Sequence, residues 1–109
     1  MNNFEATLLI SPDSSTNIIQ NVQDSFLKNI ENHGGKIDGK EDWGLRNLAY
    51  KIKQFNKAFY LFYQISIEGE KIKDVKKNLT LNEKIIRHLI VKVKNHEELP
   101  TEIMKKNQE

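Results

Sequence analysis

The chain has 109 residues, a formal net charge of +2 at neutral pH and no cysteine. This length is enough for one domain with a single core, and the lack of cysteine excludes a disulfide framework and a thiolate metal site. The apolar runs are far shorter than the ~20 residues that cross a bilayer. The start MNNFEATLLISPD has neither the basic segment nor the cleavage site of a signal peptide. Composition therefore predicts a soluble, cytosolic protein with no membrane partner.

The first expected element is a strand over residues 4–10, where apolar side chains alternate with others. The turn SPDSS then offers several helix N-caps. Apolar residues at helical spacing over 18–30 predict a helix, and the glycine pair 34–35 ends it by allowing a left-handed cap.

A long strand is expected over residues 36–53, with a bulge or bend near Gly39 or Gly44. A turn over 54–57 reverses the chain, and a third strand, rich in aromatics, follows over 58–67. This pair of strands forms a long hairpin.

A shorter amphipathic helix is expected over 72–79 and a fourth strand over 85–93, whose apolar residues occupy both parities and leave its faces unassigned. The order strand, helix, strand, strand, helix, strand is the α+β, ferredoxin-like split βαβ motif: a four-stranded antiparallel sheet with two helices on one face. Its other face stays uncovered. We expect residues 1–94 to form this domain and the polar residues 95–109 to be a disordered tail. The expected core contains Leu8, Phe26, Ile30, Ile65, Val75 and Leu79.

Positive charge gathers in two segments, because no acid occurs from Gly44 to Ile67 or from Lys84 to Lys94. Such clustering is typical of a surface that meets a phosphate backbone, although lysines on strands also prevent edge-to-edge pairing. Only two of the 17 basic residues are arginines. They occur either where a planar, bidentate group is needed or by chance. The candidate phosphate contacts are Arg46, Lys51, Lys53, Lys57, Arg87, Lys92 and Lys94.

The aromatic residues of the third strand divide between its two faces. The side of the strand that carries Leu61 and Tyr63 is the more apolar, so this side should face the helices. Tyr60 and Phe62 should then be exposed on the open face. Two aromatics beside cations are typical of a stacking platform for unpaired bases, and equally of a patch that docks a protein. Both interpretations stay open.

Catalytic and metal chemistry find little support in the sequence. The three histidines fall in a helix end, a strand and the tail, without metal-ligand spacing. The acids Asp38, Glu41 and Asp42 are expected to form a solvated turn rather than a general acid–base pair, and the glycine pair lacks a P-loop pattern. We therefore expect no enzyme, no metal, no cofactor and no small-molecule substrate.

The run GLRNLAYKIK, residues 44–53, resembles the diagnostic motif of the bacterial ribosomal protein six family of the small subunit. That motif reads Gly, any residue, basic, polar, Leu, Ala or Ser, Tyr, any residue, Ile, then usually basic. Every constrained position is met, and the resemblance extends from Phe4 to Val93. One departure is that Asn2 and Asn3 stand where family members often carry basic residues.

The resemblance implies a ferredoxin-like structural protein of the ribosome that is not an enzyme. It implies binding to the central domain of small-subunit rRNA together with ribosomal protein eighteen of the small subunit, and a cytoplasmic, ribosome-associated location. Tyr50, Tyr60 and Phe62 are then candidate contacts with RNA or with the partner protein.

Two other functions share this strand order. A stand-alone ferredoxin-like regulatory or ligand-binding module would need a pocket with convergent polar groups, and a small phosphatase-like enzyme would need a nucleophile; the sequence offers neither. Association with small ribosomal subunits would separate the ribosomal function from both.

Overall fold

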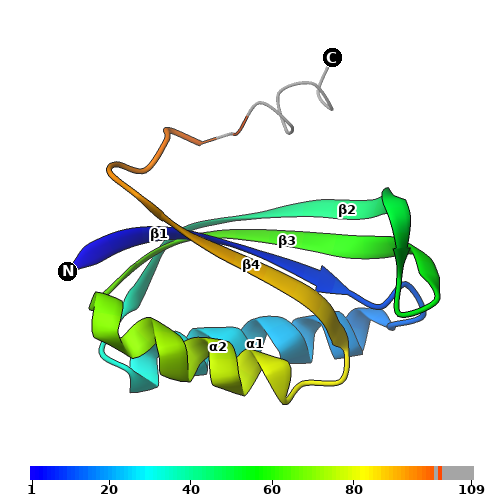
Figure 1. Ribbon diagram of the computed structural model, residues 1–109, viewed down its shortest axis with the longest axis horizontal. Helices are drawn as coiled ribbons and strands as arrows, with labels where there is room; N and C mark the ends of the chain where they lie inside the picture. Colours follow the sequence, from blue (N-terminus) through cyan, green and yellow to red (C-terminus); the bar gives the residue numbers. More distant parts are fainter. Residues whose placement is uncertain (100, 102–109) are drawn as a thin grey trace.

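The computed structural model describes residues 1–99 and 101 and has the expected order of elements. The strands and helices are β1 (Asn2–Ile10), α1 (Thr16–Asn32), β2 (Lys36–Ile52), β3 (Phe55–Ile67), a 3₁₀ turn (Gly69–Lys71), α2 (Ile72–Thr80) and β4 (Ile85–Val93). All neighbouring strands are antiparallel, in the order β2-β3-β1-β4. Both helices lie against one face of this sheet (Figure 1). The predicted ferredoxin-like fold is confirmed.

The main core fills the space between the sheet and the two helices. Alternate residues of β1 and β3 point into it, because a strand sends successive side chains to opposite faces. The six predicted core residues all belong to this cluster: Leu8, Phe26, Ile30, Ile65, Val75 and Leu79. Neither helix in the described part of the chain is long and apolar enough to cross a membrane.

The first helix begins and ends as its sequence predicts. The Ser15 side chain accepts a hydrogen bond from the Ile18 N–H (3.2 Å) and so caps the N-terminus. At the other end Gly34 has a φ of +77°, and the Gly35 N–H donates to the Ile30 carbonyl. The left-handed position needs glycine, so the chain turns there into β2.

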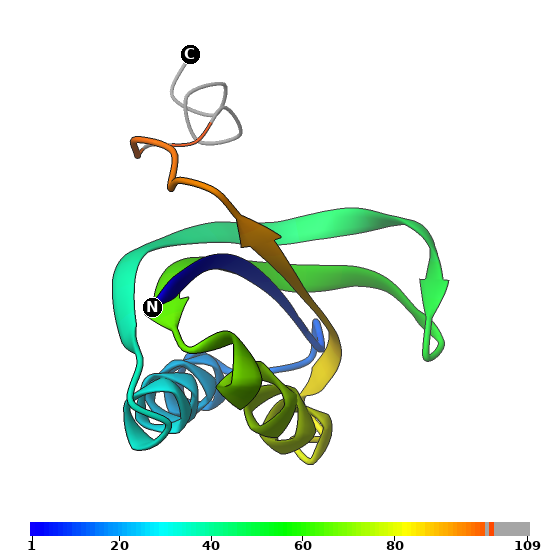
Figure 2. The same cartoon turned by 60° about the vertical axis from the view of Figure 1, so that its left-hand side comes forward.

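The hairpin of β2 and β3 is long, bulged and bent. Two of its register shifts lie between Ile37 and Gly39 and between Asp42 and Gly44, so both glycines named from the sequence mark bulges. Gly44 has a φ of +75°, and its N–H donates to Asp42 Oδ1 (2.8 Å). Figure 2 shows the far end of the hairpin bending away from the line of its strands.

The turn of this hairpin is shorter than expected. It consists of Lys53 and Gln54, both with positive φ (49° and 75°), so β3 begins at Phe55 instead of Ala58. Two residues with positive φ form the tight turn whose twist matches antiparallel strands. The prediction of a turn over 54–57 is wrong because neither Lys nor Gln is a typical residue for that conformation.

The unassigned faces of β4 are explained by a register shift against β1. Leu9 pairs with Arg87, whereas Ile10 pairs with Ile85, so Ile86 is an extra residue at this point. Ile85 therefore packs in the helix-side core and Ile86 in a second cluster on the other face. This is why apolar residues occupy both parities of the strand.

After β4 the chain runs along the sheet face opposite the helices (Figure 1). The Glu97 carbonyl accepts from Gln64 Nε2 (2.7 Å), and His96 Nε2 lies 2.9 Å from Asp38 Oδ2. The expected mobility of the tail stays a prediction. Residues 100 and 102–109 of that predicted tail lie outside the described residues.

Candidate nucleic-acid interface

The uncovered face of the sheet carries the aromatic residues that the sequence placed there. Tyr60 pairs with Leu9, and Phe62 pairs with Thr7, while the intervening Leu61 pairs with Leu8 in the helix-side core. Paired residues of antiparallel strands share a face. Tyr60 and Phe62 thus lie on the open face, as predicted.

The expected exposure of Phe62 is wrong. Its side chain is only 6% exposed, because the Trp43 ring stacks on it with a centroid distance of 5.0 Å and an interplanar angle of 11°. Trp43 also stacks beside Tyr60, at 6.4 Å and 23°. Trp43, rather than Phe62, is therefore the aromatic that a ligand on this face would meet first.

The ring of Trp43 is held in place by hydrogen bonds that reach the C-terminal segment. Its Nε1–H donates to Glu41 Oε1 (2.9 Å), and the same carboxylate accepts from Thr101 Oγ1 (2.6 Å) and from the Thr101 N–H (2.9 Å). Burial on its own would raise the pKa of Glu41, but these hydrogen bonds outweigh it and lower that pKa. Glu41 is therefore an ionised acceptor at neutral pH.

Two of the predicted cations flank Trp43 in one open cleft of about 480 Å³. Arg46 Nε donates to the Trp43 carbonyl (3.0 Å), which fixes the base of the guanidinium group. Lys57 comes from β3 and is exposed; it pairs with Asn47, and these two have the opposite strand parity from Arg46 and Tyr60, so the cleft is lined from both faces of the hairpin. The lining of the cleft is Trp43, Leu45, Arg46, Asn47, Lys57 and Tyr60.

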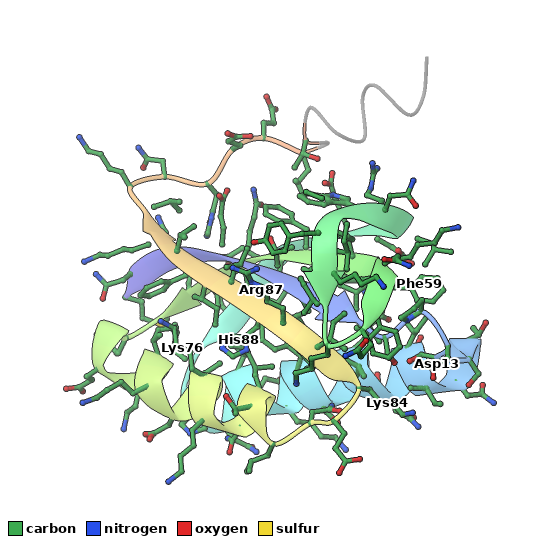
Figure 3. The ribbon with its side chains drawn as sticks, turned by 45° about the vertical axis from the view of Figure 1, so that its right-hand side comes forward. Asp13, Phe59, Lys76, Lys84, Arg87 and His88 are labelled. Carbon is green, nitrogen blue, oxygen red and sulfur yellow. The ribbon has the colours of Figure 1, made fainter. Side chains whose placement is uncertain are left out.

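Arg87 lies apart from that cleft, at the bent end of the hairpin. One of its terminal nitrogens donates to the Tyr50 hydroxyl (3.1 Å), and Lys53 lines a smaller recess of about 220 Å³ with it. Figure 3 shows Arg87 and His88 on successive positions of β4, with His88 on the side of α2 and Lys76. The predicted cations thus form two groups, Arg46 with Lys57 on the hairpin, and Arg87 of β4 with Lys53 at the hairpin turn.

The remaining cations do not join either group. Lys51 is exposed on the hairpin, and Lys94 follows β4, its carbonyl accepting from Asn3 Nδ2 (3.2 Å). Lys92 pairs with Phe4, a helix-side core residue, so it lies on the opposite face of β4 from Arg87. The seven candidate phosphate contacts therefore divide into two groups and three separate lysines.

An apolar strip lies on the open face next to Arg87. Leu89 is 49% exposed, Val91 54% and Tyr50 66%. Thr7 and Glu5 of β1 pair with Leu89 and Val91 respectively, so this strip lies over the β1–β4 side of the sheet.

The acidic residues of β2 have structural roles rather than forming a solvated turn. Asp38 accepts from the Ser66 hydroxyl and contacts His96, Glu41 orients Trp43, and Asp42 caps the Gly44 N–H. Residues 1–99 and 101 contain no group of three His, Asp or Glu side chains that could hold a metal ion.

The sequence interpretation missed Trp43 and Asn47. Trp43 directly precedes a glycine at which a bulge was expected, and a bulge re-aims neighbouring side chains. That signal was present, but the direction in which Trp43 points could not be read from it.

These features define a ferredoxin-like domain whose uncovered face carries aromatic side chains together with Arg46 and Arg87. The model of the family described as ribosomal protein S6 matches residues 3–92. The small ribosomal subunit protein bS6 of Rickettsia felis is 38% identical over 105 residues, which cover 96% of this chain and 87% of that relative. The chain belongs to the ribosomal protein S6 family.

Two further relatives support membership of the same family. The small ribosomal subunit protein bS6 of Wigglesworthia glossinidia brevipalpis is 38% identical over 111 residues, covering 100% of this chain and 97% of that protein. The crystal structure of 30S ribosomal protein S6 from Thermotoga maritima has a TM-score of 0.81 and 25% identity, covering 98% of this chain and 94% of that one. These relatives are ribosomal proteins rather than enzymes, which agrees with the family and the absence of catalysis inferred from the motif.

Proposed function

We propose that this protein binds the central domain of small-subunit rRNA together with ribosomal protein eighteen of the small subunit, in the cytoplasm, as a structural component of the ribosome. The observation that carries the proposal is the arrangement of the open face. One group of cations on the hairpin and one where β4 meets the hairpin turn flank aromatic side chains, and an apolar strip lies beside the second group.

The cations of these two groups are available to phosphates. The ion pairs within residues 1–99 and 101 involve Lys36, His96 and the N-terminus, and none involves Arg46, Lys57 or Arg87. Cations without acidic partners attract a polyanion and release its counterions on contact. The lack of basic residues at positions 2 and 3 makes these two groups more important.

The apolar strip fits a protein partner. Exposed Leu89, Val91 and Tyr50 are the kind of apolar and aromatic side chains that form the centre of protein interfaces, with an arginine at the edge. RNA contacts on the hairpin and protein contacts over β1 and β4 then occupy neighbouring parts of one face.

A stand-alone ligand-binding module is the alternative. The cleft beside Trp43 is the observation that favours it, since it brings aromatic and polar side chains together. Association with ribosomes separates the two functions, because a free module would not co-purify with small subunits in a salt-dependent manner.

The test is binding of the rRNA central domain, with and without ribosomal protein eighteen, at several salt concentrations. Lys57→Gln should lower the salt slope of log affinity by about one unit. Arg87→Lys should weaken binding with little change of slope, because the charge stays and only the planar group is lost.

Lys73→Gln, on the wet side of α2, is the matched control and should change neither quantity. Leu89→Ser should weaken the complex with the partner protein and spare binding of RNA. If the wild-type protein binds neither rRNA nor the partner, the proposed function is wrong.

A further inference from the structure

The cleft beside Trp43 combines three kinds of side chain. Trp43 and Tyr60 supply aromatic rings, Arg46 and Lys57 supply positive charge, and Asn47 supplies an amide. Four of the six lining residues come from β2 and two from β3, so the bulged hairpin alone builds the cleft.

Each of these groups suits one part of a nucleotide. An indole ring stacks on any base, because every base has a π-face, and guanidinium and ammonium groups bind phosphate. An asparagine amide has both a donor and an acceptor for the edge of an unpaired base. The volume of about 480 Å³ lies within the usual range for small-ligand sites of about 300–1,000 Å³.

The cleft is also preorganised. Phe62 supports one face of the Trp43 ring, and Glu41 holds its N–H. The Trp43 carbonyl in turn accepts from Arg46 Nε, which leaves the terminal nitrogens of that guanidinium for a ligand. Groups already held in position lose little conformational entropy when a ligand binds.

We propose that this cleft binds one unpaired nucleotide of RNA, with its base stacked against Trp43 and Tyr60 and its phosphate held by Arg46 and Lys57. Asn47 contacts the edge of the base. The proposal rests on the proposed binding of rRNA and specifies where a single nucleotide leaves its helix and enters the protein. It assigns the stacking role to Trp43, since Phe62 lies beneath that ring.

The first test uses the full-length protein and short single-stranded RNA. Trp43 is the only tryptophan, so a base that stacks on it quenches the entire indole emission. Hexamers of adenylate and uridylate should quench it in a saturable way. An abasic ribose-phosphate hexamer should bind several-fold more weakly and should not quench. If the abasic oligomer binds equally well, the cleft binds only phosphate groups and the proposal is wrong.

The second test uses variants and the anisotropy of a labelled hexamer. Trp43→Leu should weaken binding on the order of tenfold, as expected for the loss of one stacked base, whereas Trp43→Phe, which keeps a ring, should retain most of the affinity. Arg46→Gln and Lys57→Gln should each weaken binding and lower the salt slope by about one unit. Lys73→Gln on α2 is the control and should behave as wild type.

Binding of the rRNA central domain separates this proposal from the broader one. If Trp43→Leu and Arg46→Gln bind that rRNA with wild-type affinity, the nucleotide cleft is wrong, although the protein still binds rRNA elsewhere. If no variant and no wild-type protein binds rRNA while hexamers still quench Trp43, the cleft stands and the proposed function fails. A correctly folded Trp43→Phe variant guards against loss of binding through misfolding.

Discussion

The two faces of the sheet are covered in different ways. On one face the helices seal a core made of apolar side chains from all four strands. On the other, a small cluster of Leu9, Ala58 and Ile86 lies under the bent hairpin, and the C-terminal segment attaches through polar contacts to Asp38 and Glu41. The first face gives the fold its stability, whereas the second leaves its apolar strip and its cations free to bind.

The largest expected effect is a deletion in the helix-side core. Ile30 is fully buried on α1, so Ile30→Ala should lower the free energy of unfolding by about 2–5 kcal/mol. Leu27→Ala is the matched control on the same helix, since Leu27 is 41% exposed and should cost far less. Urea denaturation measures both. If the free energy of unfolding of Ile30→Ala is within about half a kcal/mol of wild type, Ile30 is not part of the core.

The next largest expected effect is on the attachment of the C-terminal segment to the sheet. Thr101→Val removes the hydroxyl that donates to the Glu41 carboxylate, a hydrogen bond to a charged group worth about 1.5–3 kcal/mol of local docking free energy. Global stability should change little, because this segment lies outside the core.

Hydrogen exchange and iodide quenching of Trp43 report on that docking. The Thr101 amide should exchange faster in native-like conditions than amides of the sheet, and faster still in Thr101→Val, with Trp43 more accessible. Strong protection from residue 95 onward that matched the sheet would contradict the predicted mobility. No protection at Thr101 would instead contradict the docking contact.

A substitution at Tyr63 should have a smaller effect, and it should raise the stability of the protein instead of lowering it. Its hydroxyl is buried in the helix-side core without a hydrogen-bond partner among the described residues, and burial raises its pKa. Tyr63→Phe removes this unpaired group and keeps the ring that packs on Phe26, so stability should rise by about 1 kcal/mol. A loss of stability of that size, measured by thermal unfolding, would show that the hydroxyl has a partner.

The smallest effect is a pH dependence at His88. Burial, with a contribution from Lys76, lowers its pKa below the ordinary 6.5, and Figure 3 places the two side chains between β4 and α2. The unfolded chain therefore binds a proton more readily than the folded one. Stability is complete above pH 6.5 and decreases as the pH falls through that value towards the lowered folded pKa.

Urea unfolding at a series of pH values measures how the free energy of unfolding changes with pH. His88→Gln should abolish the His88 component, and Lys76→Met should reduce it while leaving the component due to burial. A wild-type slope that survives in His88→Gln would assign it to another group.

The sequence was informative where periodicity decides the structure. The alternation in β1 and β3 and the helical spacing in α1 and α2 identified the six core residues, because each pattern fixes which side chains share a face. The same reasoning placed Tyr60 and Phe62 on the open face.

Prediction from the sequence failed where one extra residue changes the register of a strand. The bulge at Ile86 and the bulge before Gly44 set the direction of Trp43 and of the β4 side chains, and a bulge is located only approximately by a glycine. The cleft beside Trp43 depends on these shifts. Contacts of the C-terminal segment were also beyond reach, since they join residues about 60 positions apart, as Thr101 and Glu41 are.

The hairpin separates charge along its own length. The early part of β2 carries Asp38, Glu41 and Asp42 against Lys36 and Lys40, and the exposed Glu97 and Glu98 of the C-terminal segment nearby make this end net acidic. From Arg46 onward the charged residues of β2 are all basic. A molecule with such a dipole experiences a torque in the field of a polyanion before any contact forms. The bent end of the hairpin, with Lys51 and Lys53, would turn towards the nucleic acid and the acidic end away from it, so the first collisions are already oriented.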